Sequence, residues 1–263
     1  MPKKNVIFVR ANSLARHAIV RYGRKQLGVT LLAEYPKSGG SWVGEMLSVA
    51  LNVPFPRNKL PVLGSQILHG HYMPNGRPEN TYVVVRDGRD VMVSYYYHCF
   101  FENEHFNGGL VERTRRILDI KTPENIEENL PRFIESLFTR KLFPKFTWSE
   151  FVTSWIEIDG YVLKYEDLLA DAPGVLQSAI KSVAGIDVPS QVLEDISERY
   201  SFQNMSKRKP GVENTNSFMR KGIAGDWKNS FSNESRSVFD HYAGKELIKL
   251  RYEKDRSWVS RPD

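Results

Sequence analysis

A lysine, serines and a pair of glycines stand between an apolar run and a helix-like pattern. Thr30–Ala33 is the apolar run, and the polar residues that follow are Lys37, Ser38, Gly39, Gly40 and Ser41. Backbone N–H groups at a helix start lack partners within the helix, and glycines let the main chain approach a ligand closely. The junction therefore predicts an anion site, with an ordinary Gly-Gly turn as the alternative. The lysine precedes the glycines, which is the wrong order for a Walker A loop.

A second set of polar residues follows an uncharged, β-branched run. Thr81–Val85 has the pattern of a strand buried on both faces, and Arg86 comes directly after it. Ser94 lies in the helix-like stretch beyond. A guanidinium fork beside a hydroxyl suits a phosphate group, although Arg86 could instead form a structural ion pair with Asp87 or Asp90.

Two histidines, His69 and His71, follow another short apolar run. Histidine titrates near neutral pH, so either one is a candidate general base. No cysteine or carboxylate stands close to them in the sequence to complete a metal site, and we expect no metal.

Composition limits the class of protein. The chain has 263 residues, of which 41% are hydrophobic, and this is enough for a full core. Its net charge of +6 favours an anionic partner, and its single cysteine rules out an internal disulfide. We expect no signal peptide and no membrane-spanning segment, and hence a cytoplasmic protein.

Three motifs together resemble those of the cytosolic-type sulfotransferases. Pro36–Trp42 resembles the family's 5′-phosphosulfate loop, and Arg86 with Ser94 is similar to its 3′-phosphate element. Phe218–Asn229 resembles its C-terminal Arg-Lys-Gly-x-x-Gly-Asp-Trp-Lys-Asn signature. The resemblance implies transfer of a sulfuryl group from 3′-phosphoadenosine 5′-phosphosulfate (PAPS) to a hydroxyl or an amine. The product nucleotide is then 3′-phosphoadenosine 5′-phosphate (PAP).

The resemblance also implies roles for individual residues. His71 takes the place of the family's catalytic histidine, with His69 as the alternative, and Lys37 stabilises the leaving phosphate. Trp42 and Phe202 could stack on adenine, although both could instead pack in the core. The implied donor-binding residues are Lys37, Ser38, Gly39, Gly40, Ser41, Trp42, Arg86, Ser94, Tyr165, Phe202, Phe218, Met219, Arg220, Lys221 and Gly222.

These residues must be positioned by a sheet. We predict one α/β domain over residues 1–263, with a central parallel sheet flanked by helices and a P-loop-like phosphosulfate loop. Its strands lie near 31–35, 67–71, 81–86 and 160–164, and the nucleotide binds at their carboxyl ends.

The acceptor is the least determined partner. Residues 99–146 read as a lid or an acceptor-docking insertion, with Ile126, Leu130, Phe133 and Leu137 on one helix face. We expect a small-molecule or carbohydrate acceptor, no nucleic acid and no stable membrane insertion. The family's dimer motif is not matched after Lys228.

Two other functions remain open at this stage. A P-loop kinase-like phosphotransferase could use the same basic residues, and magnesium dependence would distinguish it. A non-catalytic nucleotide-binding protein would keep its function when His71 is replaced.

Overall fold

The computed structural model describes residues 6–57, 59–76, 79–105 and 107–261. The chain forms two compact units from interleaved segments. The second unit consists of Tyr35–Ser38, Arg86–Ser154 and the residues from Ser201 onward, and the first unit holds the remainder. The predicted phosphate loop is therefore divided, because Lys37 and Ser38 belong to the second unit whereas Gly39 and Gly40 belong to the first.

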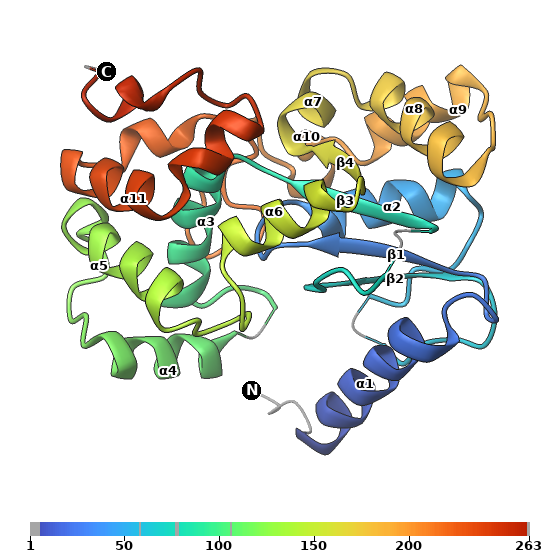
Figure 1. Ribbon diagram of the computed structural model, residues 1–263, viewed down its shortest axis with the longest axis horizontal. Coiled ribbons are helices and arrows are strands. Elements are labelled where there is room, and N and C mark those ends of the chain that lie inside the picture. The colour runs from blue at the N-terminus through green and yellow to red at the C-terminus, as the bar shows by residue number, and fades with distance from the viewer. Residues whose placement is uncertain (1–5, 58, 77–78, 106, 262–263) are drawn as a thin grey trace. The chain divides into compact units, whose positions relative to one another are not determined.

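The first unit contains a four-stranded sheet in the order β2-β1-β3-β4 (Figure 1). Every neighbouring pair of strands is parallel. The strands are β1 (Val29–Glu34), β2 (Gln66–Gly70), β3 (Thr81–Val85) and β4 (Tyr161–Lys164). This confirms the predicted α/β fold with a central parallel sheet. The bounds differ slightly from those predicted, since β1 begins earlier and Tyr35 and Arg86 lie just beyond strand ends.

Helices bury both central strands. Every residue of β1 and of β3 is buried, as their continuous apolar sequences predict. The helices α2 (Gly40–Ala50), α7 (Tyr165–Ala170), α8 (Ala172–Ala184) and α9 (Ser190–Arg199) share one apolar core with the sheet. Leu47 of α2, Leu168 of α7, Leu176 of α8 and Leu193 of α9 belong to that core. Because α2 follows β1 after a short loop, its first turn lies near the carboxyl end of β1.

The N-terminal part of the first unit is a helix that changes its winding. The helix α1 (Val6–Ala18) continues into a π-helical turn, η1 (Ile19–Gly23), before the chain enters β1. Gly28 has a φ of +62°, and a side chain there would lie 2.8 Å from the Ser65 hydroxyl. The turn between η1 and β1 therefore requires a glycine at this position.

The second unit is mainly helical. It contains α3 (Gly88–Phe100), α4 (Gly108–Leu118), α5 (Ile126–Thr139), α10 (Phe202–Ser206), η2 (Asp226–Asn229), α11 (Asn233–Lys249) and η3 (Arg256–Val259). The helix α6 (Trp148–Glu157) begins in this unit. Figure 1 shows α5 (green) beside α11 (red), and α3 contacts both.

The predicted helix within residues 99–146 is α5. Leu130, Phe133 and Leu137 are buried, as their spacing predicts. Because α5 packs against α3 and α11, it is part of the core of the second unit. The predicted role of residues 99–146 as a lid or acceptor insertion stays a prediction.

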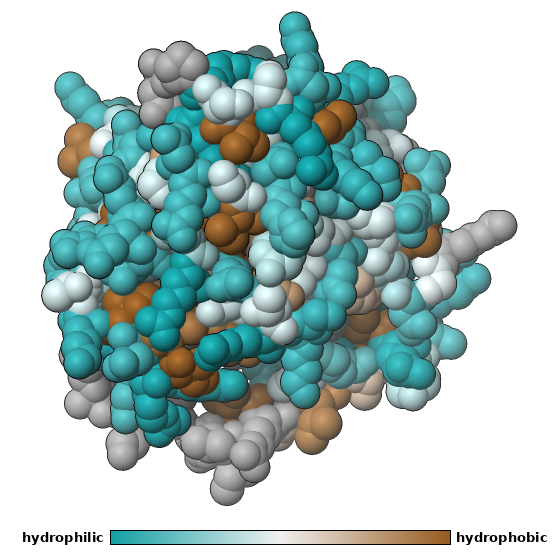
Figure 2. All heavy atoms as spheres, turned by 60° about the vertical axis from the view of Figure 1, so that its left-hand side comes forward, coloured by the Kyte–Doolittle hydropathy of each residue, from teal (hydrophilic) through white to brown (hydrophobic). Residues whose placement is uncertain are grey.

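Figure 2 shows one face of the molecule with hydrophobic residues in small, separate patches among hydrophilic ones. None of the helices within the described residues is long and apolar enough to span a bilayer.

Candidate active site

In the first unit, the end of the phosphate loop is shaped by an aromatic ring. Gly39 has a φ of +103° and directly precedes α2. A Cβ at this position would lie 2.8 Å from the ring of Tyr165, the first residue of α7. Glycine is thus required both by the backbone conformation and by the approach of Tyr165. Ser41 lies in the first turn of α2 and is partly exposed.

Trp42 is held beside the same tyrosine. Its ring meets that of Tyr165 edge to face, with the centroids 5.6 Å apart. Its indole N–H donates to the carbonyl of Tyr200 at 2.7 Å. The structure therefore brings together Gly39, Trp42 and Tyr165, three residues that the sequence predicts to bind the donor.

A buried carboxylate links the first turn of α2 to a histidine. Glu34, the last residue of β1, accepts a hydrogen bond from the Gly40 N–H at 2.6 Å. Its other oxygen lies 2.6 Å from His69 Nε2. Because the ring nitrogen faces a carboxylate, Nε2 of His69 carries a proton and donates it. The Glu34 carboxylate thus accepts from one of the N–H groups that the sequence predicts to bind an anion.

His71 lies just beyond β2 and bonds to the backbone of the same glutamate. Its Nδ1 lies 3.1 Å from the carbonyl oxygen of Glu34. A carbonyl oxygen can only accept, so Nδ1 carries the proton and Nε2 carries the lone pair in the neutral ring. The two imidazole rings are edge to face, with centroids 6.1 Å apart.

Burial shifts the pKa values of His71 and Glu34 in opposite directions. For His71, burial lowers the pKa and outweighs the attraction of Glu34, which raises it. For Glu34, burial raises the pKa, but His69, His71 and the Gly40 N–H together lower it by more than burial raises it. His71 is therefore neutral near pH 7, and Glu34 is ionised.

In the second unit, Lys37 lies against the signature segment that begins at Phe218. Lys37 has a φ of +71°, and its ammonium donates to the Phe218 carbonyl at 3.2 Å. The same nitrogen lies 3.6 Å from the centre of the Phe218 ring. Ser38 is fully buried, and its hydroxyl has no hydrogen-bond partner among the described residues. A buried hydroxyl of this kind fits a polar ligand, since such groups are normally hydrogen-bonded.

Arg86 and Asp90 join the start of α3 to the signature. Arg86 is mostly buried and donates to the Ile223 carbonyl at 3.0 Å, with Asp90 3.7 Å away. Asp90 also accepts from the N–H groups of Gly225 and Trp227, at 2.7 and 2.9 Å. The predicted alternative of a structural ion pair is thus present with Asp90, and Asp87 pairs with Arg89. Ser94 is buried two turns further along α3.

The two cations of the signature share one carboxylate. Arg220 and Lys221 each lie 2.5 Å from an oxygen of Asp226, and Arg220 also pairs with Glu213. Burial raises the pKa of Asp226, but the bonds from Lys221, Asn229 and Arg220 outweigh it and lower the pKa to about 2. Both cations are therefore held in place over the whole physiological pH range.

Phe202 packs against the glycine of the signature. Gly222 has a φ of +67°, and a Cβ there would overlap the Phe202 ring. The guanidinium of Arg208 lies 5.2 Å from the centre of that ring and donates to the backbone of Met219 and Arg220. Phe202 is only 9% exposed, so the predicted alternative of packing applies to much of its surface.

Three residues that position these groups lie outside the sequence motifs. Glu34 is an acid at the carboxyl end of a central strand, which is a usable signal. Arg208 stands in a basic run whose pattern does not indicate its contacts. Glu104 accepts from the Phe218 N–H at 2.9 Å, and nothing in the local sequence marks it. Within the described residues, no group of three or more His, Cys, Asp or Glu could hold a metal ion.

Comparison with known proteins identifies the family. Residues 80–251 match the model of the "Sulfotransferase domain". Bovine "Sulfotransferase 1A1" is 25% identical to this chain, over 84% of this chain and 85% of the relative.

Solved structures share the fold. A mouse sulfotransferase complexed with PAP superposes with a TM-score of 0.60 at 20% identity, covering 87% of this chain and 88% of the other. A retinol dehydratase in a complex with retinol and PAP superposes with a TM-score of 0.61 at 17% identity, covering 92% and 86%. The chain belongs to the sulfotransferase family and is a PAPS-dependent sulfotransferase.

Proposed function

We propose that His71 is the general base and that the acceptor is a small molecule with a hydroxyl group. The observation that carries this proposal is the hydrogen bond from His71 Nδ1 to the Glu34 carbonyl. It defines the tautomer whose Nε2 can take a proton, and burial lowers the pKa of the ring so that it is neutral near pH 7. Nε2 of His69, by contrast, already donates to the Glu34 carboxylate.

The proposed reaction moves one proton and one sulfuryl group. His71 Nε2 takes the proton of the acceptor hydroxyl, whose oxygen forms the new bond to sulfur. The bond between sulfur and the bridging oxygen of the donor breaks, and the electron pair stays on the 5′-phosphate of PAP. Lys37 offsets the charge that develops on that phosphate, which lowers the barrier more than it tightens substrate binding.

We assign donor binding to the residues expected from the sequence. In the second unit, the supporting features are the buried hydroxyl of Ser38, the mostly buried guanidinium of Arg86 and the cations Arg220 and Lys221. In the first unit, they are the start of α2 and the aromatic pair of Trp42 and Tyr165. Cationic side chains and unsatisfied polar groups suit a ligand that carries phosphates and a sulfate. The remaining assigned residues are Gly39, Gly40, Ser41, Ser94, Phe202, Phe218, Met219 and Gly222.

The proposed acceptor class rests on the family. Retinol, the ligand of one structural neighbour, is an alcohol with an apolar body. We also propose that residues 99–146 help to select the acceptor, because Glu104 within them binds the backbone of Phe218 in the signature. Cytoplasmic location remains a proposal, which cell fractionation tests.

A binding and turnover experiment tests the assignment. PAP should bind the purified protein without magnesium and more tightly than adenosine 5′-phosphate, which lacks the 3′-phosphate. Sulfate transfer from PAPS should then be screened with matched alcohols, phenols, amines and sugars. Transfer to amines or sugars alone would overturn the proposed acceptor class, and a His71→Ala variant with full turnover would overturn the proposed base.

Membership of the sulfotransferase family replaces the two alternatives left open by the sequence. A phosphotransferase would prefer ATP with magnesium, and a non-catalytic binding protein would not turn over PAPS. The same titration and assay detect either result.

A further inference from the structure

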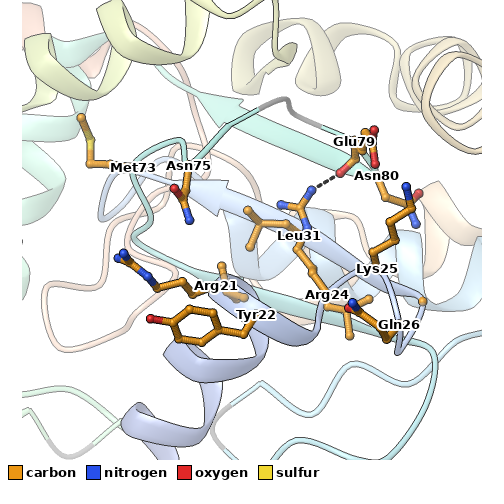
Figure 3. Close-up of a pocket in the computed structure, with 13 residues that line it drawn as sticks. Arg21, Tyr22, Arg24, Lys25, Gln26, Leu31, Met73, Asn75, Glu79 and Asn80 are labelled. Carbon is orange, nitrogen blue, oxygen red and sulfur yellow. Dashed lines mark hydrogen bonds between the residues drawn. The ribbon is translucent and has the colours of Figure 1, made fainter.

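A basic cavity lies in the first unit, at the turn between η1 and β1. Its volume is about 470 Å³, and Arg21, Arg24 and Lys25 contribute three cationic side chains against the single acid Glu79. Asn75 and Asn80 add amide groups to the wall. Figure 3 shows Arg24 and Lys25 on the side of Glu79 and Asn80, and Arg21 on the opposite side next to Tyr22. None of the residues assigned to PAPS or to the base lines it.

One of the three cations is anchored by the protein. Arg24 donates through Nη2 to the backbone carbonyl of Glu79, as the dashed line in Figure 3 marks. That bond uses one of the five N–H donors of a guanidinium. Burial lowers the pKa of Arg24, although Glu79 raises it in part, so this charge is partly removed from water. A partly dehydrated cation attracts an anion more strongly than one in bulk solvent.

Apolar and aromatic side chains line the side of the cavity that holds Arg21. Tyr22, Leu31 and Met73 line it, and Tyr22 belongs to the π-helical turn η1. Single π-helical turns within helices are rare and occur often at functional sites. The volume of the cavity lies in the usual range for sites of small organic ligands, and its largely polar lining favours a ligand that carries a charge.

We propose that this cavity binds a small phosphate or sulfate ester. The anionic group of the ester lies beside Arg24 and Lys25, and its carbon body extends toward Tyr22 and Met73, where Arg21 adds a further positive charge. Such a site is separate from the donor-binding residues and does not depend on the identity of the acceptor. It would take an ester as a second ligand while PAP is bound.

The test uses the full chain saturated with PAP, so that the donor-binding residues are occupied. Phenyl phosphate and phenyl sulfate are titrated by calorimetry, and neutral phenol is the matched probe without the anion. Hydrogen–deuterium exchange of residues 19–29 locates the binding. We expect slower exchange there with either ester and no change with phenol. Phosphate and sulfate are compared directly to show which ester binds more tightly.

Two variants separate this cavity from other basic surfaces. Arg21→Gln combined with Lys25→Gln should weaken ester binding about tenfold or more, because each charge-assisted contact contributes strongly. Arg132→Ala removes an exposed cation of α5 and should leave binding unchanged. Raising the salt concentration should weaken binding to the wild type.

Three results would overturn the proposal. They are absence of protection over residues 19–29, equal protection by phenol, or unchanged ester affinity in the double variant. Protection at other segments alone would show that the esters bind elsewhere. Because PAP is present throughout and turnover is not measured, these results do not depend on the proposed base.

Discussion

In each unit a buried acid contacts candidate ligand-binding groups, but the groups that it contacts differ between the units. In the first unit, Glu34 pairs with His69 and with the Gly40 N–H, and the neighbouring group is the titratable His71. In the second unit, Asp226 pairs with the cations Arg220 and Lys221, and its pKa is lowered to about 2. The first cluster is therefore suited to moving a proton, and the second to holding two cations in fixed positions. Five experiments can break or sharpen this contrast.

Removing the proposed base should have the largest effect. His71→Ala should lower kcat by about 10²–10⁴-fold, the usual contribution of general base catalysis. PAP affinity, measured by calorimetry, should stay within a factor of about two, because a base adds little to ground-state nucleotide binding. His69→Ala is the matched control, and a greater loss of kcat in that variant would move the base to His69.

Breaking the buried acid cluster of the first unit should mainly cost stability. Glu34→Ala leaves His69 and the Gly40 N–H without their shared partner in a buried place. We expect the free energy of unfolding to fall by about 3–5 kcal/mol, as measured by urea denaturation. Glu34→Gln should lose less, because an amide can still accept from Gly40. Equal losses in the two variants would show that the charge, not the hydrogen bonding, carries the effect.

Removing a permanent charge of the second unit should instead weaken nucleotide binding. Arg86→Ala should raise the Kd of PAP by about 10–100-fold, corresponding to the loss of about 1.5–3 kcal/mol from charged hydrogen bonds. Adenosine 5′-phosphate, which lacks the 3′-phosphate, should bind both proteins with similar affinity. If both nucleotides weaken equally, Arg86 does not contact the 3′-phosphate.

The dependence of kcat/KM on pH should show the smallest change near neutrality. Together with PAP binding, it distinguishes the roles of the two units. Because burial lowers the pKa of His71, kcat/KM should remain high below pH 6.5, the ordinary histidine value, and decline at more acid pH. PAP binding should follow only the second ionisation of its own phosphate groups, at about pH 6, since the pKa of Asp226 is about 2. A loss of PAP affinity larger than that ionisation accounts for would contradict the division of roles. A decline centred above pH 6.5 would contradict the lowered pKa.

The pKa values of the two acids also predict how stability depends on pH. The pKa values of Glu34 and Asp226 are both lowered in the folded state. Each ionised carboxylate therefore stabilises the fold at pH values above its unfolded pKa. That contribution is lost as the pH falls through the folded value, which for Asp226 is about 2. Acid unfolding, followed by circular dichroism, should therefore begin at a lower pH in the wild type than in Asp226→Asn.

The sequence alone predicted the strands, the loop between β1 and α2, and the family. Continuous apolar runs such as Thr81–Val85 specify buried parallel strands, because every side chain must avoid water. An apolar run is a property of neighbouring residues, so a local pattern expresses it. The reason for Gly39 and Gly222 is only partly local, because the rings that approach them, Tyr165 and Phe202, come from distant parts of the chain.

Only the tertiary structure decided which groups share a proton or a charge. Glu34 of β1 forms a hydrogen bond with His69 of the neighbouring strand β2. Glu104, in the connection between α3 and α4, accepts from the N–H of Phe218, which is far away in the sequence. The sequence left His69 and His71 as alternatives, because both stand at the same strand end and differ only in their partners. Hydrogen-bond partners far apart in the chain are chosen by packing, since the register of β1 with β2 places Leu32 beside His69 and leaves His71 beyond the strand. A one-dimensional pattern does not contain that register, and it is the register that gives the two histidines different chemistry.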